Sequence, residues 1–224
     1  MLGSMTVRAL LVIALLTVLT ACGTASTPQP PTGVDELVVP TPSPDPDDFV
    51  AAVDNSWLPL PAGRTWTYEV VDASGTHPVT VTVASGPAVA GVATTARVAT
   101  EEGAVTRDWF AQDRDGNVWW FGREGEWRAG ERGAQAGLAM PANPRVGDGY
   151  RTAYLPGVVE DVAEVEALDG SATVPAGTYD GLLVTRVTTK LEPGASTEQH
   201  WARDVGLVEE DRPGRIVRLR EVTG

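Results

Sequence analysis

The sequence has little cysteine and little histidine, and these shortages exclude several kinds of site. Cys22 is the single cysteine among 224 residues, so no disulfide can form within the chain. With that one cysteine and two histidines, His77 and His200, the chain lacks the ligands that a zinc site usually needs. It also lacks the Gly-x-Ser-x-Gly turn of α/β-hydrolases. We therefore predict no catalytic residue and no cofactor.

Positive charge and long apolar runs are also scarce. The formal net charge of −13 repels phosphate backbones, which excludes nucleic acid as an expected partner. It also disfavours adsorption to an anionic bilayer. The main apolar run, at 9–19, is shorter than the about 20 residues of a transmembrane helix. Because 42% of the residues are hydrophobic, the composition is that of a globular protein.

The first 21 residues have the pattern of a signal peptide that ends at a lipidation site. Arg8 precedes the apolar run, whose length fits the about 7–15 residues of a signal-peptide core. The run ends in Leu-Thr-Ala-Cys-Gly at 19–23, which resembles the lipobox of bacterial lipoproteins. The resemblance implies a diacylglyceryl group on Cys22, further acylation by a fatty acid such as palmitate, and cleavage between Ala21 and Cys22. We expect a mature chain held on the extracytoplasmic face of the cell membrane by this lipid.

The segment that follows is rich in proline. Seven prolines lie between residues 23 and 48, with Thr, Ser, Gly and Asp between them. Such a segment has too little apolar surface to offset the entropy of ordering, so we expect a disordered, extended tether. The predicted organisation is a signal peptide at 1–21, the lipidated cysteine and tether at 22–48, and a globular domain at 49–224.

The globular part shows alternation of polar and apolar residues with the period of a β-strand. The predicted strands are 65–71, 77–84, 92–100, 105–112, 118–121, 150–154, 158–168, 181–191, 198–203, 206–210 and 216–222. Turn residues separate them, for example at 85–87, 115–117, 169–170 and 213–214. We expect two short helical turns, at 49–53 and 134–140. This pattern predicts a mainly β domain in which antiparallel meander strands form a curved sheet or half-barrel. The sheet either packs under a second layer or encloses a cavity.

Five segments in this order resemble a family of uncharacterised exported bacterial proteins of actinomycete type, many of them lipoproteins. The segments are 54–69, 113–122, 140–148, 173–180 and 201–208. The resemblance implies no activity. The Val-Pro-Ala-Gly-Thr segment at 174–178 is also similar to curved-sheet periplasmic proteins such as half-barrel lipoprotein carriers, which suggests a fold more than a function.

Two groups of residues are candidates for a binding site. Asp113, Asp115 and Asn117 place oxygen ligands at alternate positions beside a glycine, as calcium loops do, although a hairpin turn explains the same residues. Four tryptophans, Trp109, Trp119, Trp120 and Trp127, fall within one short region. Trp119 and Trp120 must point to opposite faces of a strand, so this group is either core or a ligand surface.

The acids of 160–166 fit a solvated strand face. Glu160, Glu164 and Glu166 share one face, whereas Asp161 lies on the other. A glycosidase pair is the alternative interpretation and would need a cleft.

The leading hypothesis is therefore a membrane-anchored, non-enzymatic domain that binds an apolar or mixed ligand. A structural or assembly protein of the envelope, whose partner is another protein, is the second hypothesis. A hydrolase of unrecognised type is the third.

Overall fold

The computed structural model describes residues 45–224, which lie within one compact unit of the chain. The predicted signal peptide, Cys22 and most of the predicted tether fall outside these residues. Pro46–Asp48 form a single 3-10 turn (η2), and every other regular element described is a strand. The strands are β1 (Phe49–Val50), β2 (Thr65–Asp72), β3 (Gly75–Val89), β4 (Val92–Glu101), β5 (Ala104–Asp113), β6 (Val118–Arg123), β7 (Trp127–Arg128), β8 (Gln135–Met140), β9 (Gly149–Leu155), β10 (Val159–Val174), β11 (Gly177–Thr189), β12 (Ser196–Ala202), β13 (Gly206–Arg212) and β14 (Arg215–Thr223).

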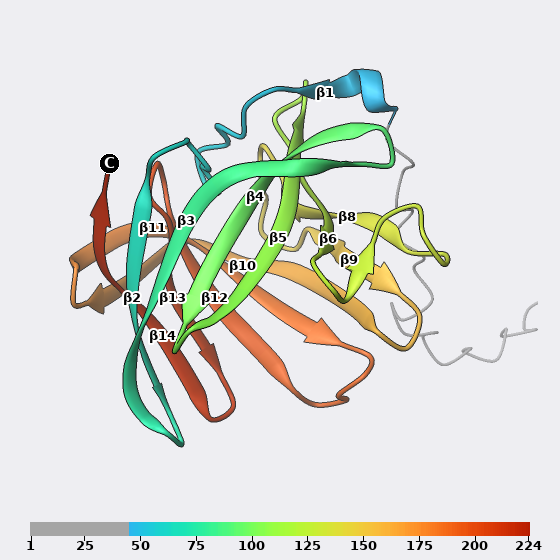
Figure 1. Ribbon diagram of the computed structural model, residues 1–224. Helices are drawn as coiled ribbons and strands as arrows, with labels where there is room; N and C mark the ends of the chain where they lie inside the picture. The colour runs from blue at the N-terminus through green and yellow to red at the C-terminus, as the bar shows by residue number, and fades with distance from the viewer. Residues whose placement is uncertain (1–44) are drawn as a thin grey trace, which may run out of the picture. The chain divides into compact units, whose positions relative to one another are not determined.

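The strands form one antiparallel sheet that closes on itself (Figure 1). The mainly β, single-domain prediction is confirmed, but the half-barrel is wrong, because twelve of the strands make a closed barrel. The first long strand, β2, pairs with the last, β14, from Asp72↔Arg215 to Thr65↔Thr223. This pairing joins residues far apart in sequence, so the local strand pattern contains no signal for it.

The predicted helix at 134–140 is wrong, because these residues are the strand β8. It pairs with β6 on one side and with β9 on the other, and so completes the barrel wall. Gly137 permits this, since a Cβ there would lie 2.3 Å from the backbone of Thr152. Barrel closure therefore overrides the helix propensity of an Ala- and Met-containing segment.

Three smaller predictions are also corrected. Residues 49–53 begin with the two-residue strand β1, which pairs with β5, and form no helical turn. The predicted turns at 85–87 and 169–170 lie inside the long strands β3 and β10. Each coincides with a register shift against the neighbouring strand, so these residues bend a strand without ending it.

The two ends of the barrel differ. The connection from β1 to β2 crosses one end, at the top of Figure 1, and buries Trp57, Leu58 and Leu60. We call residues 53–60 the plug. The other end carries the turns after β2, β4, β6, β9, β11 and β13, and we call this end the mouth.

Apolar side chains pack on both sides of the barrel wall. One cluster joins the plug to inward residues such as Val81, Val165 and Leu219. A second cluster covers outward residues of β4, β5, β6 and β9, including Trp109 and Trp119. Within residues 45–224, no helix has the length and apolar character to span a membrane.

A candidate ligand cavity in the barrel

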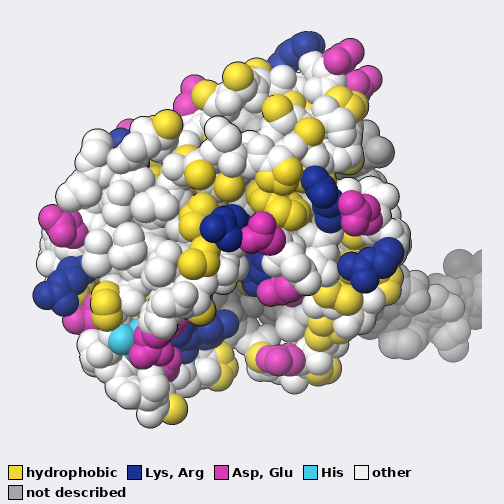
Figure 2. Space-filling model, viewed as in Figure 1, with side chains coloured by type: hydrophobic (Ala, Val, Ile, Leu, Met, Phe, Trp, Pro, Cys, Tyr) yellow, Lys and Arg dark blue, Asp and Glu magenta, His cyan; other side chains and the backbone are white. Residues whose placement is uncertain are grey.

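The lumen of the barrel holds a cavity of about 1060 Å³. Side chains from every strand of the closed barrel line it, and so do residues of the plug and of the turns at the mouth. In the space-filling view a hollow opens in the lower part of the molecule, with basic, acidic and apolar side chains around it (Figure 2). Ligand pockets are commonly about 300–1,000 Å³, so this volume is large enough for a small amphiphile.

The floor of the cavity is apolar and is fixed by hydrogen bonds. Leu58, Pro59 and Leu60 of the plug form it. The Asn55 side chain accepts hydrogen bonds from the backbone N–H groups of Trp57 and Leu58, at 2.8 and 3.2 Å, and donates to the carbonyl of Gly116 at 2.8 Å. These hydrogen bonds satisfy the buried backbone N–H groups of Trp57 and Leu58 and hold the plug against the barrel wall.

The Gln112 side chain of β5 ties the same segment to the barrel wall. Its oxygen accepts hydrogen bonds from the N–H groups of Asp54 and Asn55, at 2.9 and 2.8 Å, and its amide donates to the Asp54 carboxylate at 2.6 Å. Leu58, Pro59 and Leu60, the first residues of the Leu-Pro-Leu-Pro-Ala-Gly run at 58–63, thus close one end of the barrel.

Aromatic side chains line the next level of the lumen. Phe110 and Trp120 are cross-strand partners and stack with their ring centroids 6.2 Å apart. On the facing part of the wall the indole N–H of Trp66 donates to the carbonyl of Val205 at 2.7 Å. The Tyr68 hydroxyl donates to the carbonyl of Leu207 at 3.1 Å, and burial raises the pKa of this phenol. The polar atoms of both rings are thus satisfied at the wall, which leaves apolar surface toward the cavity.

A row of charged side chains lines one side of the lumen closer to the mouth. Arg97, Asp108 and Arg123 are successive cross-strand partners on β4, β5 and β6, and all three line the cavity. The Asp108 side chain is only 5% exposed, and its carboxylate lies 2.7 Å from Nε of Arg123 and 3.8 Å from Nη1 of Arg97. The Arg123 guanidinium also lies over the Trp120 ring, 5.2 Å from its centroid. We call these three residues the charged row.

Besides Asp108, the cavity is lined by Asp72, Glu126, Asp161, Glu192 and Glu210, and two of these lie opposite the charged row. Burial raises the pKa of Asp161 on β10, while a hydrogen bond with Thr189 and the charge of Arg123 oppose this shift. On β13, the Glu210 carboxylate accepts a hydrogen bond from the Gln199 side chain at 3.0 Å. The lumen is therefore apolar at its floor and polar toward its mouth.

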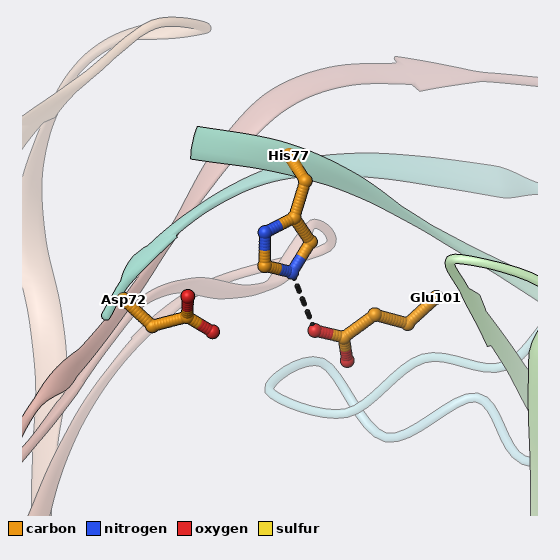
Figure 3. A group of neighbouring side chains, drawn as sticks. All are labelled: Asp72, His77 and Glu101. Carbon is orange, nitrogen blue, oxygen red and sulfur yellow. Dashed lines mark hydrogen bonds and ion pairs between the residues drawn. The ribbon is translucent and has the colours of Figure 1, made fainter. Parts of the chain in front are cut away.

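A group of Asp72, His77 and Glu101 at the mouth has the composition of a metal site (Figure 3). His77 Nε2 lies 2.7 Å from Glu101 Oε1, and this hydrogen bond raises the pKa of the histidine. However, the Arg215 guanidinium binds both oxygens of Glu101, at 2.7 and 2.8 Å, and one oxygen of Asp72 at 3.2 Å. Its hydrogen bonds lower the pKa of Glu101. Because a bidentate guanidinium occupies the carboxylates, the group fits an ion-pair network better than a cation.

The four predicted tryptophans lie on both sides of the barrel wall. Trp109, Trp119 and Trp127 are buried in the outer cluster, and Trp127 also reaches the cavity near the mouth. Trp120 is half-buried and faces the lumen. The neighbours Trp119 and Trp120 thus point to opposite faces, each covered by apolar packing.

The candidate calcium residues form the hairpin turn between β5 and β6. One Asp113 oxygen accepts a hydrogen bond from the Asn117 backbone at 2.9 Å. The other accepts from the Asn117 amide and the Trp119 indole, at 3.0 and 2.8 Å. Gly116 has a φ of 88° and closes the turn by donating to the carbonyl of Asp113 at 3.0 Å. Asp115, within the same turn, is exposed.

The acids of β10 divide as the strand period requires. Asp161 lines the cavity, whereas Glu166 pairs outside with Arg186 and Glu164 is exposed. His200 has a side chain that is 13% exposed, and its Nε2 lies 3.6 Å from Glu198. Neither histidine lines the cavity.

The charged row was not among the residues predicted from the sequence. Asp108 directly precedes two buried aromatic residues, and a lone acid in such a position is the one local sign of it. That Arg97 and Arg123 lie on either side of it follows from strand pairing, which the sequence pattern alone does not give.

Comparison with known proteins gives two similar folds. No protein-family model and no curated protein matches this chain. A protein from Bacteroides fragilis, described as exported and as having a YmcC-like fold, is 14% identical with a TM-score of 0.43, over 75% of this chain and 99% of that chain. A protein from Parabacteroides distasonis, described as a lipoprotein, is 12% identical with a TM-score of 0.41, over 75% of this chain and 98% of that chain. We draw no conclusion about function from either likeness.

Proposed function

We propose that this chain is a lipid-anchored, extracytoplasmic binding protein whose barrel takes up an apolar or mixed small molecule. The observation that carries the ligand part is the cavity of about 1060 Å³, which has an apolar floor and a polar upper wall. A closed barrel of this kind can hold a ligand without changing its conformation, because its strands already form the site. The anchor part rests on the sequence of residues 1–48.

The apolar side chains of the floor and of the aromatic level favour ligand binding as the role of this cavity. Leu58, Leu60, Trp66 and Phe110 are each at most 8% exposed, yet all four border the cavity. Apolar walls around a space of this volume gain free energy when an apolar group replaces water, at about 25 cal/mol per Å² of surface buried.

The ligand part is tested by extracting the chain purified from envelope membranes with organic solvent and identifying small molecules by mass spectrometry. We expect an amphiphile in amounts close to one per chain. The matched control is Leu60→Arg, which places a charge at the floor and should remove the molecule while the lipid on Cys22 remains. An extract in which wild type and Leu60→Arg are the same contradicts ligand binding.

The anchor part is tested separately. Replacement Cys22→Ser should move the chain from the membrane fraction to the released fraction, since two or three acyl chains at this residue supply the attachment. Ser196→Ala, far from the lipobox in sequence, is the control and should leave fractionation unchanged. A Cys22→Ser chain that stays with the membrane excludes the anchor and leaves the ligand proposal standing.

A further inference from the structure

We infer that the lumen selects single-chain amphiphiles with an anionic head group, a carboxylate or a phosphate, and that Arg97 is the residue that binds this head. This inference deepens the proposed function and rests on it. Three features of the lumen support it: the pairing of the charged row, the order of levels along the barrel, and the state of the neighbouring acids.

The charged row contains two guanidinium groups for one carboxylate. Asp108 Oδ1 is 2.7 Å from Nε of Arg123, which is a hydrogen bond, whereas Asp108 Oδ2 is 3.8 Å from Nη1 of Arg97, which is too long for one. Among residues 45–224, Asp108 is the carboxylate paired with Arg97. The Arg97 guanidinium, whose side chain is 27% exposed, therefore keeps N–H donors for an acceptor in the lumen. Carboxylate and phosphate oxygens match this fork of donors.

The levels along the barrel fix the direction of the ligand. Phe110 lies two residues from Asp108 along β5, and its partner Trp120 lies three residues from Arg123 along β6, so the aromatic level is about 7 Å nearer the floor than the charged row. Leu58 and Leu60 lie beyond it at the floor. A head group at Arg97 consequently places an alkyl chain against the aromatic rings and the plug.

None of the other acids that line the cavity, which are Asp72, Glu126, Asp161, Glu192 and Glu210, forms an ion pair with Arg97. Glu210 accepts a hydrogen bond from Gln199, and Asp161 pairs across the strands with Thr189. Because burial raises the pKa of Asp161, this carboxyl takes up a proton more readily than an ordinary aspartate when a second anion approaches. Removal of its charge should therefore favour an anionic ligand, the opposite of the effect of removing Arg97.

The experiment is calorimetric titration of the full chain carrying Cys22→Ser, which is free of lipid and needs no detergent. The probes share one alkyl chain and differ in the head: dodecanoate, dodecyl phosphate, neutral dodecanol and cationic dodecyltrimethylammonium, with inorganic phosphate as the head alone. We expect dodecanoate and dodecyl phosphate to bind more tightly than dodecanol. Arg97→Gln should weaken both anions by about tenfold to a hundredfold, as loss of a charged hydrogen bond does. Asp161→Asn should tighten them.

The controls separate the head-group inference from the cavity itself. Arg220→Gln removes an exposed guanidinium that, like Arg97, has an acid at 3.8 Å, and it should change nothing. Binding of dodecanol by Arg97→Gln at wild-type strength shows that the variant is folded with its cavity intact. Equal binding of dodecanoate and dodecanol, or preference for the cation, overturns the anionic inference and leaves the proposed function standing. If inorganic phosphate binds as tightly as dodecyl phosphate, the inference that the ligand is an amphiphile is overturned. Failure of all the alkyl probes overturns the inference together with the proposed function.

Discussion

The two ends of this barrel differ in how their side chains are packed and exposed. At the plug, Asn55 and Gln112 use their side-chain hydrogen bonds to hold apolar residues in one position, and Trp57 is only 1% exposed. At the mouth, charged side chains meet in a network, and apolar residues such as Val158 and Leu191 are 48% and 43% exposed. The plug therefore contributes stability, whereas the mouth provides access to the lumen.

The largest expected effect is at the plug. Trp57→Ala should lower the free energy of unfolding by about 3–5 kcal/mol, because it leaves a cavity in a fully packed site and removes the ring that lies under the Arg203 guanidinium. Urea denaturation measures this loss. Trp120→Ala is the comparison: its ring borders the existing cavity, so the loss should be smaller. Equal losses would remove the distinction between plug and lumen.

A smaller loss is expected when the hydrogen bonds of the plug are broken. Asn55→Ala leaves the buried N–H groups of Trp57 and Leu58 without their acceptor, which should cost about 1–3 kcal/mol in the free energy of unfolding. The control Asn143→Ala changes an exposed asparagine and should stay within about 0.5 kcal/mol of wild type. Denaturation of both variants in urea decides this, and similar values for the two would mean that Asn55 does not fix the plug.

The stability that the mouth contributes should depend on pH, whereas the stability that the plug contributes should not. The hydrogen bond with Glu101 raises the pKa of His77 above its ordinary value of 6.5. A raised pKa in the folded state stabilises the fold at pH values below the unfolded pKa, and this stabilisation disappears as the pH rises through the folded pKa. The melting temperature should therefore decline as the pH is raised from about 6.5, and His77→Gln should flatten that decline. A decline of the same size in His77→Gln would assign it to another group.

The smallest effect on stability is expected at the rim of the mouth. Leu191→Ser changes a residue that is already 43% exposed, so the free energy of unfolding should stay within about 0.5 kcal/mol of wild type. Because Leu191 borders the cavity at the mouth, away from the plug toward which the alkyl chain points, the same variant should leave the binding of dodecanoate close to that of wild type. Urea denaturation and calorimetry on one preparation measure both. A clear loss of stability would show that the rim belongs to the packed core.

Features of the fold that depend on residues close together in sequence could be predicted, whereas features that depend on pairing between distant residues could not. The strands of the meander follow from local alternation, as in Thr65–Asp72, where buried and less buried residues alternate. Closure does not, because it depends on the pairing of β2 with β14 and on a segment at Gln135–Met140 whose composition favours a helix. The same limit applies to the site. Trp120 was among the predicted candidates, whereas Arg97 lines the cavity only through its register with Asp108.

Crystals of the Cys22→Ser chain grown with dodecanoate that carries bromine on its last carbon test the central claim most directly, because anomalous scattering locates the bromine. If the lumen binds the ligand, we expect a bromine peak near the floor, beside Leu58, Leu60 and Trp66, and carboxylate density at Arg97. A bromine peak confined to the outer surface, with water filling the lumen, would contradict the proposal that this barrel is a ligand carrier.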